Sequence, residues 1–585
     1  MTIEKTFDLA VQNHKKNNFQ VAENLYKEVL KINPNHFGSI FLLGTLSIKI
    51  KNFDRAIQLL NQAILIQPNH AQSHNNLGVV FVELGEVQKA ISCYQKAISI
   101  QPNYADAHYN LGNVLDKLNK HQEAIICYEK VIQINPNYVA AHYNQGNALK
   151  ELGEFKKAIS CYQKAINSKH NYAPAYNNML FTLLYMEKTD SKYYLSKTRE
   201  FRSSLKPIND DLLLKYQFNI KPKKLRIGFV SGDFREHPVG FFLLDTLNHL
   251  KNNDLELIAY SNSQIEDSLS IKLKSHFTIW HEIASQSNMD VINKIRKDGI
   301  HVLVDLSGHS EKNRLPIFIN KPAPVQVSWV GYPGSTGIPE IDYLIGDPFV
   351  TPENMNGHFT EKIFRLPNIW VCFTAPDFDV QISDLPVIKN GYVTFGSFNH
   401  LSKINDEVIS LWSKILKSIP KSKIFLKTKQ LNNSYLKEKI ISKFKENGIN
   451  LNSIILEEGT SRSKLLNSYN KVDIALDPFP YSGGVTSLEA IWMGVPVLTK
   501  KGFRFVSHTT ESINHNSGMS DWVANDENEY VTKAIKFSTN LELLTGINKS
   551  LRQVALESPL FNSTLFAKQL NNAFWEMWNN FILKM

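Results

Sequence analysis

A 34-residue repeat fills the first third of the chain and constrains its fold more than any other feature. Its most regular positions are the glycines Gly44, Gly78, Gly112 and Gly146 and the prolines Pro34, Pro68, Pro102 and Pro136. The pattern around them predicts a helix, a short turn and a second helix that the proline ends. Such helix pairs stack into a superhelix with a concave groove, because each pair buries its apolar face against its neighbours.

The repeat resembles the tetratricopeptide repeat over residues 3 to about 180. Asparagines keep the same step at Asn76, Asn110, Asn144 and Asn178. Asparagine is a poor residue for a helix interior, and its amide can both donate to and accept from an extended peptide backbone. We therefore predict a peptide-binding ladder along the groove. Hydrogen bonding between helices of the array is the alternative.

Composition narrows the class of protein. The 585 residues carry a formal net charge of +10, and 43% are hydrophobic, which is ordinary for a chain of several globular domains. No recognised nucleic-acid motif accompanies the positive charge, so no nucleic-acid partner is expected. The N-terminal stretch lacks the apolar core of a signal peptide, and no apolar run reaches about 18 residues. We expect a cytoplasmic protein without a membrane span.

Three of the four cysteines, Cys93, Cys127 and Cys161, also follow the 34-residue step. Two interpretations are open: a metal or redox ladder, or one small packing position that is copied three times. The packing interpretation is favoured, and so few cysteines argue against a disulfide scaffold.

The remaining chain predicts an α/β architecture. A repeat array over residues 1–178 and a charged helical transition over 179–224 precede two series of apolar β runs, in 225–388 and 389–585. The first series contains LRIGFV, LELIAY, HVLVDL and VQVSWV, and the second contains YVTFGSF, KIFLKT, IILEEG, VDIAL and VPVLT. This predicts two doubly wound, Rossmann-like domains with a ligand cleft at the carboxyl ends of their strands. An aromatic-rich helix is expected to close the chain.

A glycine turn marks a candidate anion site. DPFPYSGGVTSLEAIWMGVPVLT (477–499) follows a strand, and Thr486 and Ser487 lie where a helix N-terminus would present free N–H groups. The spacing fits neither a Walker A motif nor a dinucleotide fingerprint. Lys403, in GSFNHLSKIND, also follows a strand and can neutralise a diphosphate leaving group. His237, in VSGDFREHPVGFF, is a candidate general base at the mouth of the cleft.

These motifs resemble the SPINDLY and O-GlcNAc transferase family, in which tetratricopeptide repeats are fused to a GT-B glycosyltransferase of family 41. The matching stretches, over about residues 225–500, are LRIGFVSGDFREHPVGFF, DGIHVLVDLSGHS, PAPVQVSWVGYPGSTG, DYLIGD, FGSFNHLSKI and DIALDPFPYSGGVTSLEAIWMGVPVLT. They occur in the family's order, and the repeats extend the resemblance over nearly the whole chain.

The resemblance implies roles for particular positions. His237 matches the family's proposed base, and Lys403 matches its diphosphate-binding lysine. Donor-binding positions are implied at Asn399, His400, Ser461, Arg462, Leu465, Ser468, Gly483, Gly484, Val485, Thr486 and Glu489, with Gly331 and Pro333 in the loop beside the sugar. Family members invert the anomeric carbon and use no metal, so no cofactor beyond the sugar nucleotide is expected.

Several positions depart from the family pattern. Leu465 stands where a uracil-stacking histidine is expected, and Ser468 where an arginine is frequent. Arg462 takes the place of a ribose-contacting lysine, and Val485 that of a frequent threonine. UDP-GlcNAc remains the expected donor, and GDP-fucose or another sugar nucleotide is the alternative.

The expected function is transfer of N-acetylglucosamine from UDP-GlcNAc to Ser or Thr hydroxyls of proteins or peptides in the repeat groove. A non-catalytic repeat scaffold with a degenerate transferase domain is the alternative from another class, and a glycan or lipid acceptor is a further one. His237, Lys403 and the glycine turn favour the enzyme, and the asparagine ladder favours a protein acceptor. A homo-oligomer through the first repeats is compatible with the sequence.

Overall fold

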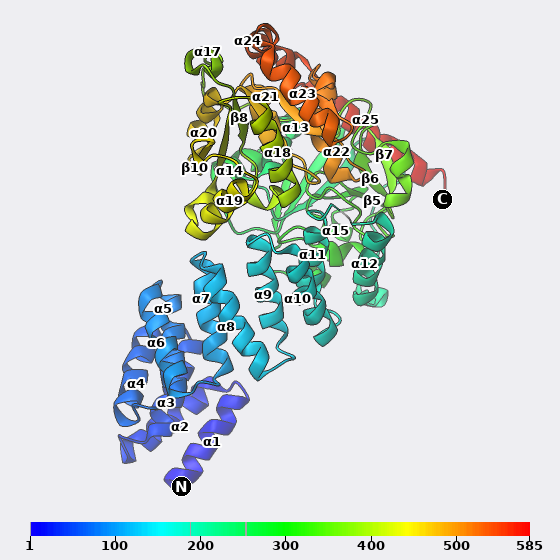
Figure 1. Ribbon diagram of the computed structural model, residues 1–585. Coiled ribbons are helices and arrows are strands. Elements are labelled where there is room, and N and C mark those ends of the chain that lie inside the picture. The colour runs from blue at the N-terminus through cyan, green and yellow to red at the C-terminus, as the bar shows by residue number, and fades with distance from the viewer. Residues whose placement is uncertain (1, 188, 252–253) are drawn as a thin grey trace. The chain divides into compact units, whose positions relative to one another are not determined.

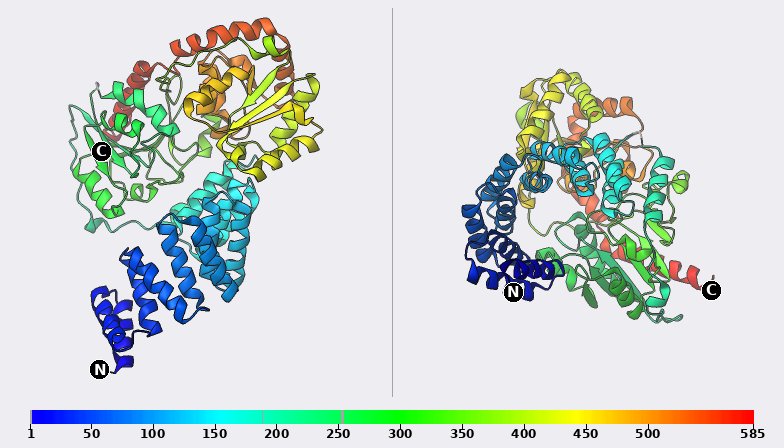
Figure 2. Two further views of the ribbon diagram at one scale, coloured as in Figure 1. Left: turned by 90° about the vertical axis from the view of Figure 1, so that its left-hand side faces the viewer. Right: turned by 90° about the horizontal axis from the view of Figure 1, so that it is seen from below.

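The structure is a computed structural model that describes residues 2–187, 189–251 and 254–585. The chain separates into two compact units, Met1–His170 and Asn171–Met585. The first unit is built of helices, and the second contains every strand of the described residues (Figures 1 and 2). This order confirms the predicted fold class, a repeat superhelix followed by α/β domains.

In the described residues 2–170 of the first unit, ten helices follow one another, and a 13-residue helix alternates with a 14-residue helix. Each odd-numbered helix packs against the even-numbered helix that follows it. The helices are α1 (Ile3–Lys15), α2 (Phe19–Ile32), α3 (Phe37–Lys49), α4 (Phe53–Ile66), α5 (Ala71–Glu83), α6 (Val87–Ile100), α7 (Ala105–Lys117), α8 (His121–Ile134), α9 (Val139–Glu151) and α10 (Phe155–Ser168).

Tyrosine packing explains three of the four repeated glycines, and the fourth, Gly44, packs against leucine side chains. A Cβ atom on Gly78 would lie 2.6 Å from the ring of Tyr94, and one on Gly112 would lie 2.7 Å from the ring of Tyr128. The tyrosine of the second helix therefore rests directly on the backbone of the first helix. This contact repeats along the array, and any larger residue at the glycine position would separate the two helices.

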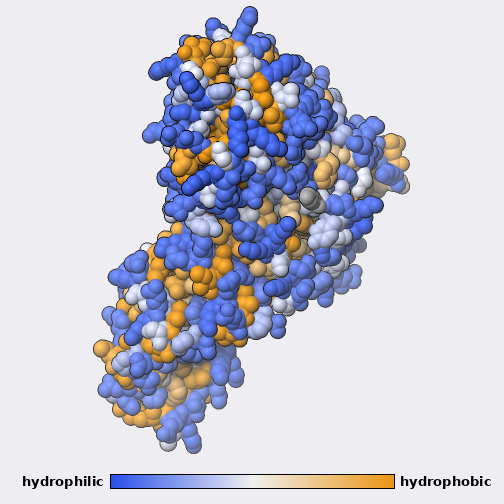
Figure 3. Space-filling view, viewed as in Figure 1, coloured by the Kyte–Doolittle hydropathy of each residue, from blue (hydrophilic) through white to orange (hydrophobic). Residues whose placement is uncertain are grey.

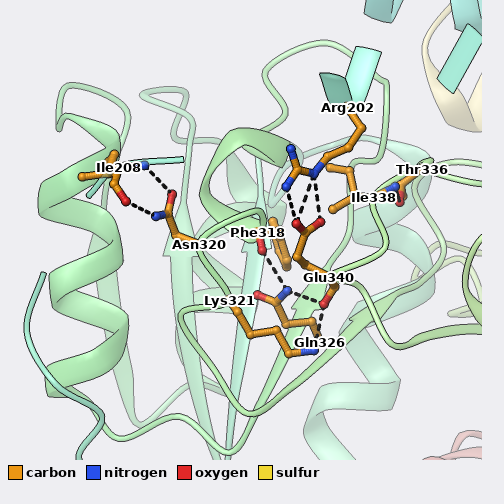
Figure 4. Close-up of polar contacts among 9 residues, drawn as sticks. All are labelled: Arg202, Ile208, Phe318, Asn320, Lys321, Gln326, Thr336, Ile338 and Glu340. Carbon is orange, nitrogen blue, oxygen red and sulfur yellow. Dashed lines mark hydrogen bonds and ion pairs between the residues drawn. The ribbon is translucent and has the colours of Figure 1, made fainter. Parts of the chain in front are cut away.

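The second unit begins with two helices, α11 (Ala173–Leu183) and α12 (Ser191–Ser204). Figure 4 shows how the chain around the end of α12 is fastened to the first α/β half. The Arg202 Nε donates to both carboxylate oxygens of Glu340, at 3.1 and 3.0 Å. The Asn320 side chain accepts from the backbone N–H of Ile208 and donates to its carbonyl. These contacts make α12 part of the α/β unit.

A seven-stranded parallel sheet forms the core of the first half, in the order β3-β2-β1-β4-β5-β6-β7. Its strands are β1 (Leu225–Ser231), β2 (Leu255–Ser261), β3 (Ile279–Glu282), β4 (Val302–Asp305), β5 (Val325–Ser328), β6 (Tyr343–Gly346) and β7 (Lys362–Arg365). Its helices are α13 (Pro238–Leu250), α14 (Ser268–Lys274), α15 (Asn288–Lys297) and α16 (Leu315–Phe318).

A six-stranded parallel sheet forms the core of the second half, in the order β10-β9-β8-β11-β12-β13. Its strands are β8 (Thr394–Ser397), β9 (Lys423–Thr428), β10 (Ile454–Glu458), β11 (Ile474–Leu476), β12 (Val497–Lys500) and β13 (Val523–Ala524). Its helices are α17 (Pro386–Asn390), α18 (Asp406–Ser418), α19 (Ser434–Glu446), α20 (Arg462–Ser468), α21 (Val485–Trp492), α22 (Phe505–Asn516), α23 (Glu527–Thr539) and α24 (Leu541–Glu557).

Both sheets reverse their direction of growth at one point, between β1 and β4 in the first and between β8 and β11 in the second. Ligands of doubly wound sheets bind outside the carboxyl ends of the strands at such a point. The fold therefore places the loops after β1 and β8, with His237 and Lys403, where a ligand site is expected.

The last helix, α25 (Ser563–Ile582), returns to the first half and packs against α13 and β5. The remaining elements are short 3₁₀ helices: η1 (Asp210–Leu212), η2 (Glu353–His358), η3 (Leu401–Lys403), η4 (Lys429–Asn432), η5 (Leu451–Ser453), η6 (Tyr469–Lys471) and η7 (Ser520–Trp522). Figure 3 shows hydrophobic side chains scattered among hydrophilic ones over the visible face. Within the described ranges, no helix is long and apolar enough to span a membrane.

Candidate active site

One cavity of about 330 Å³ lies in the second unit, where loops from both α/β halves meet. The loops that line it follow β1, β4 and β5 in the first half and β8 and β11 in the second half. The predicted residues that it brings together are His237, Gly331, Pro333, Asn399, His400, Lys403, Gly483, Gly484, Val485 and Thr486. Motifs up to about 250 residues apart thus form one site.

Lys403 is the cation of this cavity. Its Nζ donates to the Ser482 carbonyl oxygen at 2.8 Å and lies 4.2 Å from the centroid of the Tyr481 ring. Burial lowers the pKa of Lys403 to about 8, although the nearby Asp477 carboxylate acts in the opposite direction. The ammonium is still mostly charged at neutral pH, so the half-buried lysine presents a positive charge to the cavity.

The glycine turn is organised by a buried carboxylate at the end of β11. Asp477 accepts the backbone N–H of Gly483 at 2.6 Å and the hydroxyl of Thr499 at 2.7 Å. A Cβ atom on Gly483 would lie 2.2 Å from the Ser487 hydroxyl oxygen, so only glycine fits there without moving the turn. Burial raises the pKa of Asp477 to about 6, against these hydrogen bonds, which lower it.

The turn leads into α21, whose first residues line the cavity. Gly484 is the N-cap residue of α21, and no side chain caps this end of the helix. Among the contacts of the described residues, the backbone N–H groups of Gly484, Val485 and Thr486 reach no protein acceptor. The Thr486 hydroxyl donates to the Asn399 side chain at 3.1 Å. Free N–H groups and the positive end of a helix dipole suit an anion.

His237 is the N-cap residue of α13, on the opposite side of the cavity. Its Nδ1 accepts the backbone N–H of Val239 at 3.4 Å, and the Asp233 carboxylate lies 3.7 Å from the same nitrogen. Burial lowers the pKa of His237, and the Asp233 charge opposes this shift. With Nδ1 as an acceptor, the neutral ring carries its proton on Nε2, so the ring donates from that nitrogen.

Glu361, which no sequence motif indicated, fixes the loop after β5 that also lines the cavity. The buried Glu361 carboxylate accepts the Ser335 hydroxyl at 2.7 Å and the backbone N–H of Thr336 at 2.7 Å. The loop also needs Gly331, where a Cβ atom would lie 1.8 Å from a backbone carbonyl oxygen of Leu306. Local spacing could not reveal Glu361, because its partners lie about 25 residues earlier in the chain.

The remaining predicted donor residues, Ser461, Arg462, Leu465, Ser468 and Glu489, do not line this cavity. The Arg462 Nε donates to Glu489 at 3.2 Å, and its guanidinium lies 3.8 Å from the centroid of the Phe241 ring. Burial raises the pKa of Glu489, and Arg462 opposes that shift. The buried Ser468 hydroxyl donates to a backbone carbonyl within its own helix, that of Lys464. Their contact with a donor remains a prediction.

The predicted ladder residues are half-buried, with Asn76, Asn110 and Asn144 in the first unit and Asn178 on α11 of the second. The amide nitrogen of Asn110 donates to Asn75 at 3.0 Å, and that of Asn144 donates to Asn113 at 2.8 Å. These bonds link neighbouring repeats, as the alternative interpretation expected. Peptide binding by the ladder remains a prediction.

The repeated cysteines match the packing interpretation. Cys127 and Cys161 are buried, Cys93 is half-buried, and burial raises the pKa of each thiol to about 11. A thiol with such a pKa is a weak nucleophile and a poor metal ligand at neutral pH. In the described part of the chain, no three His, Cys, Asp or Glu side chains come together as a metal site would require.

Sequence profiles of known families match both units. Tetratricopeptide repeat profiles match residues 14–77, 80–119, 105–138 and 139–172. The profile of glycosyl transferase family 41 matches residues 209–376 and 382–570, which together are more than half of the chain. The chain belongs to glycosyl transferase family 41. This confirms the resemblance that the motifs indicated.

Two curated relatives of this family 41 chain carry the name probable UDP-N-acetylglucosamine–peptide N-acetylglucosaminyltransferase SPINDLY. The one from Hordeum vulgare is 32% identical over 367 residues, which is 62% of this chain and 39% of that protein. The one from Solanum lycopersicum is 30% identical over 410 residues, which is 69% of this chain and 44% of that protein. The chain thus spans about two fifths of the length of these relatives.

A solved structure covers most of the family 41 chain. It is a mutant of the O-GlcNAc transferase from Thermobaculum terrenum, with 28% sequence identity and a TM-score of 0.79. The match covers 88% of this chain and 98% of that chain. The architecture of repeats followed by two α/β halves is therefore shared with a named transferase.

Substitution of Gly483 by alanine should disrupt the turn, because the added Cβ atom would push against the Ser487 hydroxyl. We expect the affinity for UDP and GDP, measured by calorimetry, to fall roughly tenfold or more with the loss of one or two hydrogen bonds to the diphosphate. Gly546→Ala on α24 is the matched control, since a Cβ atom added there would meet nothing within 4 Å. Equal affinities in the two variants would contradict the anion site.

The pKa of Lys403 predicts a pH dependence of diphosphate binding. A bound diphosphate favours the charged lysine, which below pH 8 is already the main form. Above pH 8 binding must take up a proton, so the affinity should fall by up to about tenfold per pH unit. Calorimetry with UDP and GDP between pH 7 and 9.5 measures this. Lys403→Arg, which stays charged throughout, should remove the decline, and a decline that persists in this variant would assign it to another group.

Proposed function

We propose that this chain is a protein O-glycosyltransferase that transfers N-acetylglucosamine from UDP-GlcNAc to Ser or Thr hydroxyls, with inversion and without a metal ion. The observation that carries the proposal is the meeting of Lys403, the α21 N-terminus and His237 in one cavity at the switch points of two parallel sheets. The names of the curated relatives support N-acetylglucosamine as the sugar and a peptide as the acceptor.

In the proposed reaction an acceptor oxygen attacks the anomeric carbon from the face opposite the diphosphate. The carbon–oxygen bond to the diphosphate breaks, and its electron pair leaves with the diphosphate. Negative charge therefore develops beside Lys403 and the N–H groups of Gly484, Val485 and Thr486. Donors that the protein holds in place stabilise such charge without having to reorient. Two or three of these donors acting together account for metal-independent catalysis.

His237 is better suited to orient a reactant than to take its proton. Its Nδ1 faces the Val239 N–H and the Asp233 carboxylate, so the neutral ring presents an N–H at Nε2. That N–H can donate to a hydroxyl oxygen of the sugar or of the acceptor. The hydroxyl proton then leaves to water or to the diphosphate. A base role would require Nε2 to lose its proton, with Nδ1–H turned to Asp233.

The repeat array supports a protein acceptor. Its stacked helix pairs form the type of surface on which extended peptides bind. The side-chain oxygens of Asn110 and Asn144 accept no hydrogen bond among the contacts of the described residues, whereas their amide nitrogens link repeats. An amide oxygen that accepts a backbone N–H reads no side chain, which suits an enzyme with several acceptors.

The direct test compares wild-type protein with Lys403→Ala on a panel of UDP-GlcNAc and GDP-fucose, with mass spectrometry of modified Ser and Thr residues. We expect transfer from UDP-GlcNAc, and a turnover roughly 10²-fold or more lower in the variant, since the lost charge acts on the leaving group. Lys471→Ala, an exposed lysine outside the cavity, is the control. Transfer from GDP-fucose alone would replace the donor, and the absence of any transfer would support the scaffold alternative.

The ladder predicts a separation of activities. Replacement of Asn110 and Asn144 by alanine should lower glycosylation of protein acceptors and leave hydrolysis of the donor unchanged. The double substitution Asn75→Ala with Asn113→Ala is the matched control, because it removes the same two inter-repeat hydrogen bonds from their other ends. Kinetics with one protein acceptor and with water measure both activities. If this control lowers acceptor glycosylation as much as the ladder variant does, the asparagines serve the array alone.

A further inference from the structure

Two neighbouring residues define the place of the Lys403 ammonium. The Ser482 carbonyl oxygen accepts one of its N–H groups at 2.8 Å, and the face of the Tyr481 ring lies 4.2 Å away. Tyr481 also lines the cavity and directly precedes the glycine turn. The same short segment therefore supplies the anion-binding turn and the surface on which the lysine rests.

The Tyr481 ring is in turn packed by the helical segment that enters the second unit. Its centroid lies 4.9 Å from that of Tyr185 and 6.5 Å from that of Phe181. Phe181 lines the same cavity, and its ring lies 5.9 Å from that of Tyr332. Aromatic contacts thus run from the end of α11 to the ring below the lysine.

A buried arginine of the second half fixes the end of α11. Arg504, the N-cap residue of α22, donates to the carbonyl oxygens of Leu183 at 2.9 Å and Met186 at 2.5 Å. Burial lowers the pKa of Arg504 to about 10, so it stays charged at neutral pH. A cation at a helix C-terminus satisfies free carbonyl groups and the negative end of the dipole. Phe181 and Tyr185 therefore lie at a helix end that Arg504 holds in place.

We propose that Tyr481, held in place by Phe181 and Tyr185, is a positioning residue that keeps the Lys403 ammonium where the leaving diphosphate develops its charge. The inference rests on the proposed function, and it adds that the helical segment before the α/β halves is part of the active site. An aromatic face attracts an ammonium but accepts no proton from it, so the charge stays available to a ligand.

The chemistry of the surroundings supports this role. The Asp477 carboxylate attracts the lysine from the end of β11. His400 is the N-cap residue of η3, the short helix that carries Lys403, and His237 lines the cavity from the first α/β half. A flexible lysine can turn toward a carboxylate such as Asp477. The ring and the Ser482 carbonyl instead hold it over the cavity, and a charge that is already in place needs no reorganisation during the reaction.

The test uses the full chain with Tyr481→Leu, Tyr481→Phe and Tyr185→Leu, and Tyr435→Leu, an exposed tyrosine of α19, as control. Measured are the affinities for UDP and GDP and kcat and KM for the donor. We expect kcat/KM to fall about threefold to thirtyfold in Tyr481→Leu, mainly through kcat. Tyr481→Phe keeps the ring and should match wild type. Tyr185→Leu should lower kcat in the same direction by a smaller factor.

A double-mutant cycle separates positioning from general damage. In a Lys403→Ala background, Tyr481→Leu should change neither kcat nor affinity further, because the group that it positions is gone. Wild-type kinetics in Tyr481→Leu, or an equal additional loss in the Lys403→Ala background, would overturn the inference. If Tyr185→Leu alone has wild-type kinetics, the helical segment takes no part in positioning Lys403. If Tyr481→Leu does not fold, Tyr185→Leu and Phe181→Leu decide in its place.

The wild-type chain is assayed first, because its nucleotide binding and sugar transfer separate failure of the proposed function from failure of the inference about Tyr481. A wild-type chain that binds neither nucleotide and transfers no sugar overturns the proposed function, and the inference that rests on it falls as well. A wild-type chain that transfers sugar with a Tyr481→Leu rate equal to its own overturns the inference alone.

Discussion

The buried carboxylate of Asp477 is the interaction on which the site depends. It joins β11 to β12 through the Thr499 hydroxyl, fixes the glycine turn through the Gly483 N–H, and faces the charge of Lys403. Burial of an ion is unfavourable unless hydrogen bonds and an opposite charge offset it. Here the same hydrogen bonds that stabilise Asp477 also shape the turn of the candidate anion site, so the stability of the sheet end and the geometry of the site have one cause.

Hydrogen bonds between residues that do not line the cavity join the two α/β halves, and the cavity lies between the carboxyl ends of their strands. The Ser512 hydroxyl of α22 donates to the buried Asp347 carboxylate of the first half at 2.6 Å. The Phe373 N–H donates to the Leu560 carbonyl oxygen at 2.8 Å, which ties the crossing chain to the segment before α25. Because neither bond uses Lys403 or an N–H group of the glycine turn, the halves are joined without occupying the groups of the candidate anion site.

The sequence predicts most of the architecture for identifiable reasons. The 34-residue step and the long apolar runs of strands such as β1, β2 and β9 are periodic signals that local spacing reveals. The predicted apolar runs omit β3, β6, β7 and β13. β6 and β13 are buried, but they are short, with four and two residues. The edge strands β3 and β7 have exposed or half-buried positions that include charged residues. An edge strand covers less apolar area, so its sequence carries less of the pattern on which the prediction rests.

The site was predicted only where a motif surrounds a residue. Lys403, His237 and the turn are recognisable because strand, loop and helix follow one another locally. Phe181 and Tyr481 are 300 residues apart, and their contact exists only in the folded chain. The asparagine ladder shows the opposite limit, a sequence pattern that is clear but fits two functions. Its period is visible in the sequence, but the same amide can bind a peptide or a neighbouring repeat, and the pattern of residues is identical in both cases.

The depressed pKa of Lys403 connects this geometry to the proposed reaction. A buried ammonium is less stable than a hydrated one, and its attraction to Asp477 does not offset the burial. The lysine therefore interacts more strongly with an arriving charge than a fully solvated lysine would, because the protein around it screens charge less than water does. In the proposed reaction, that charge is useful only if it stays where the diphosphate departs. An aromatic ring is suited to keep it there, since it stabilises the cation weakly and leaves most of the attraction for the transition state.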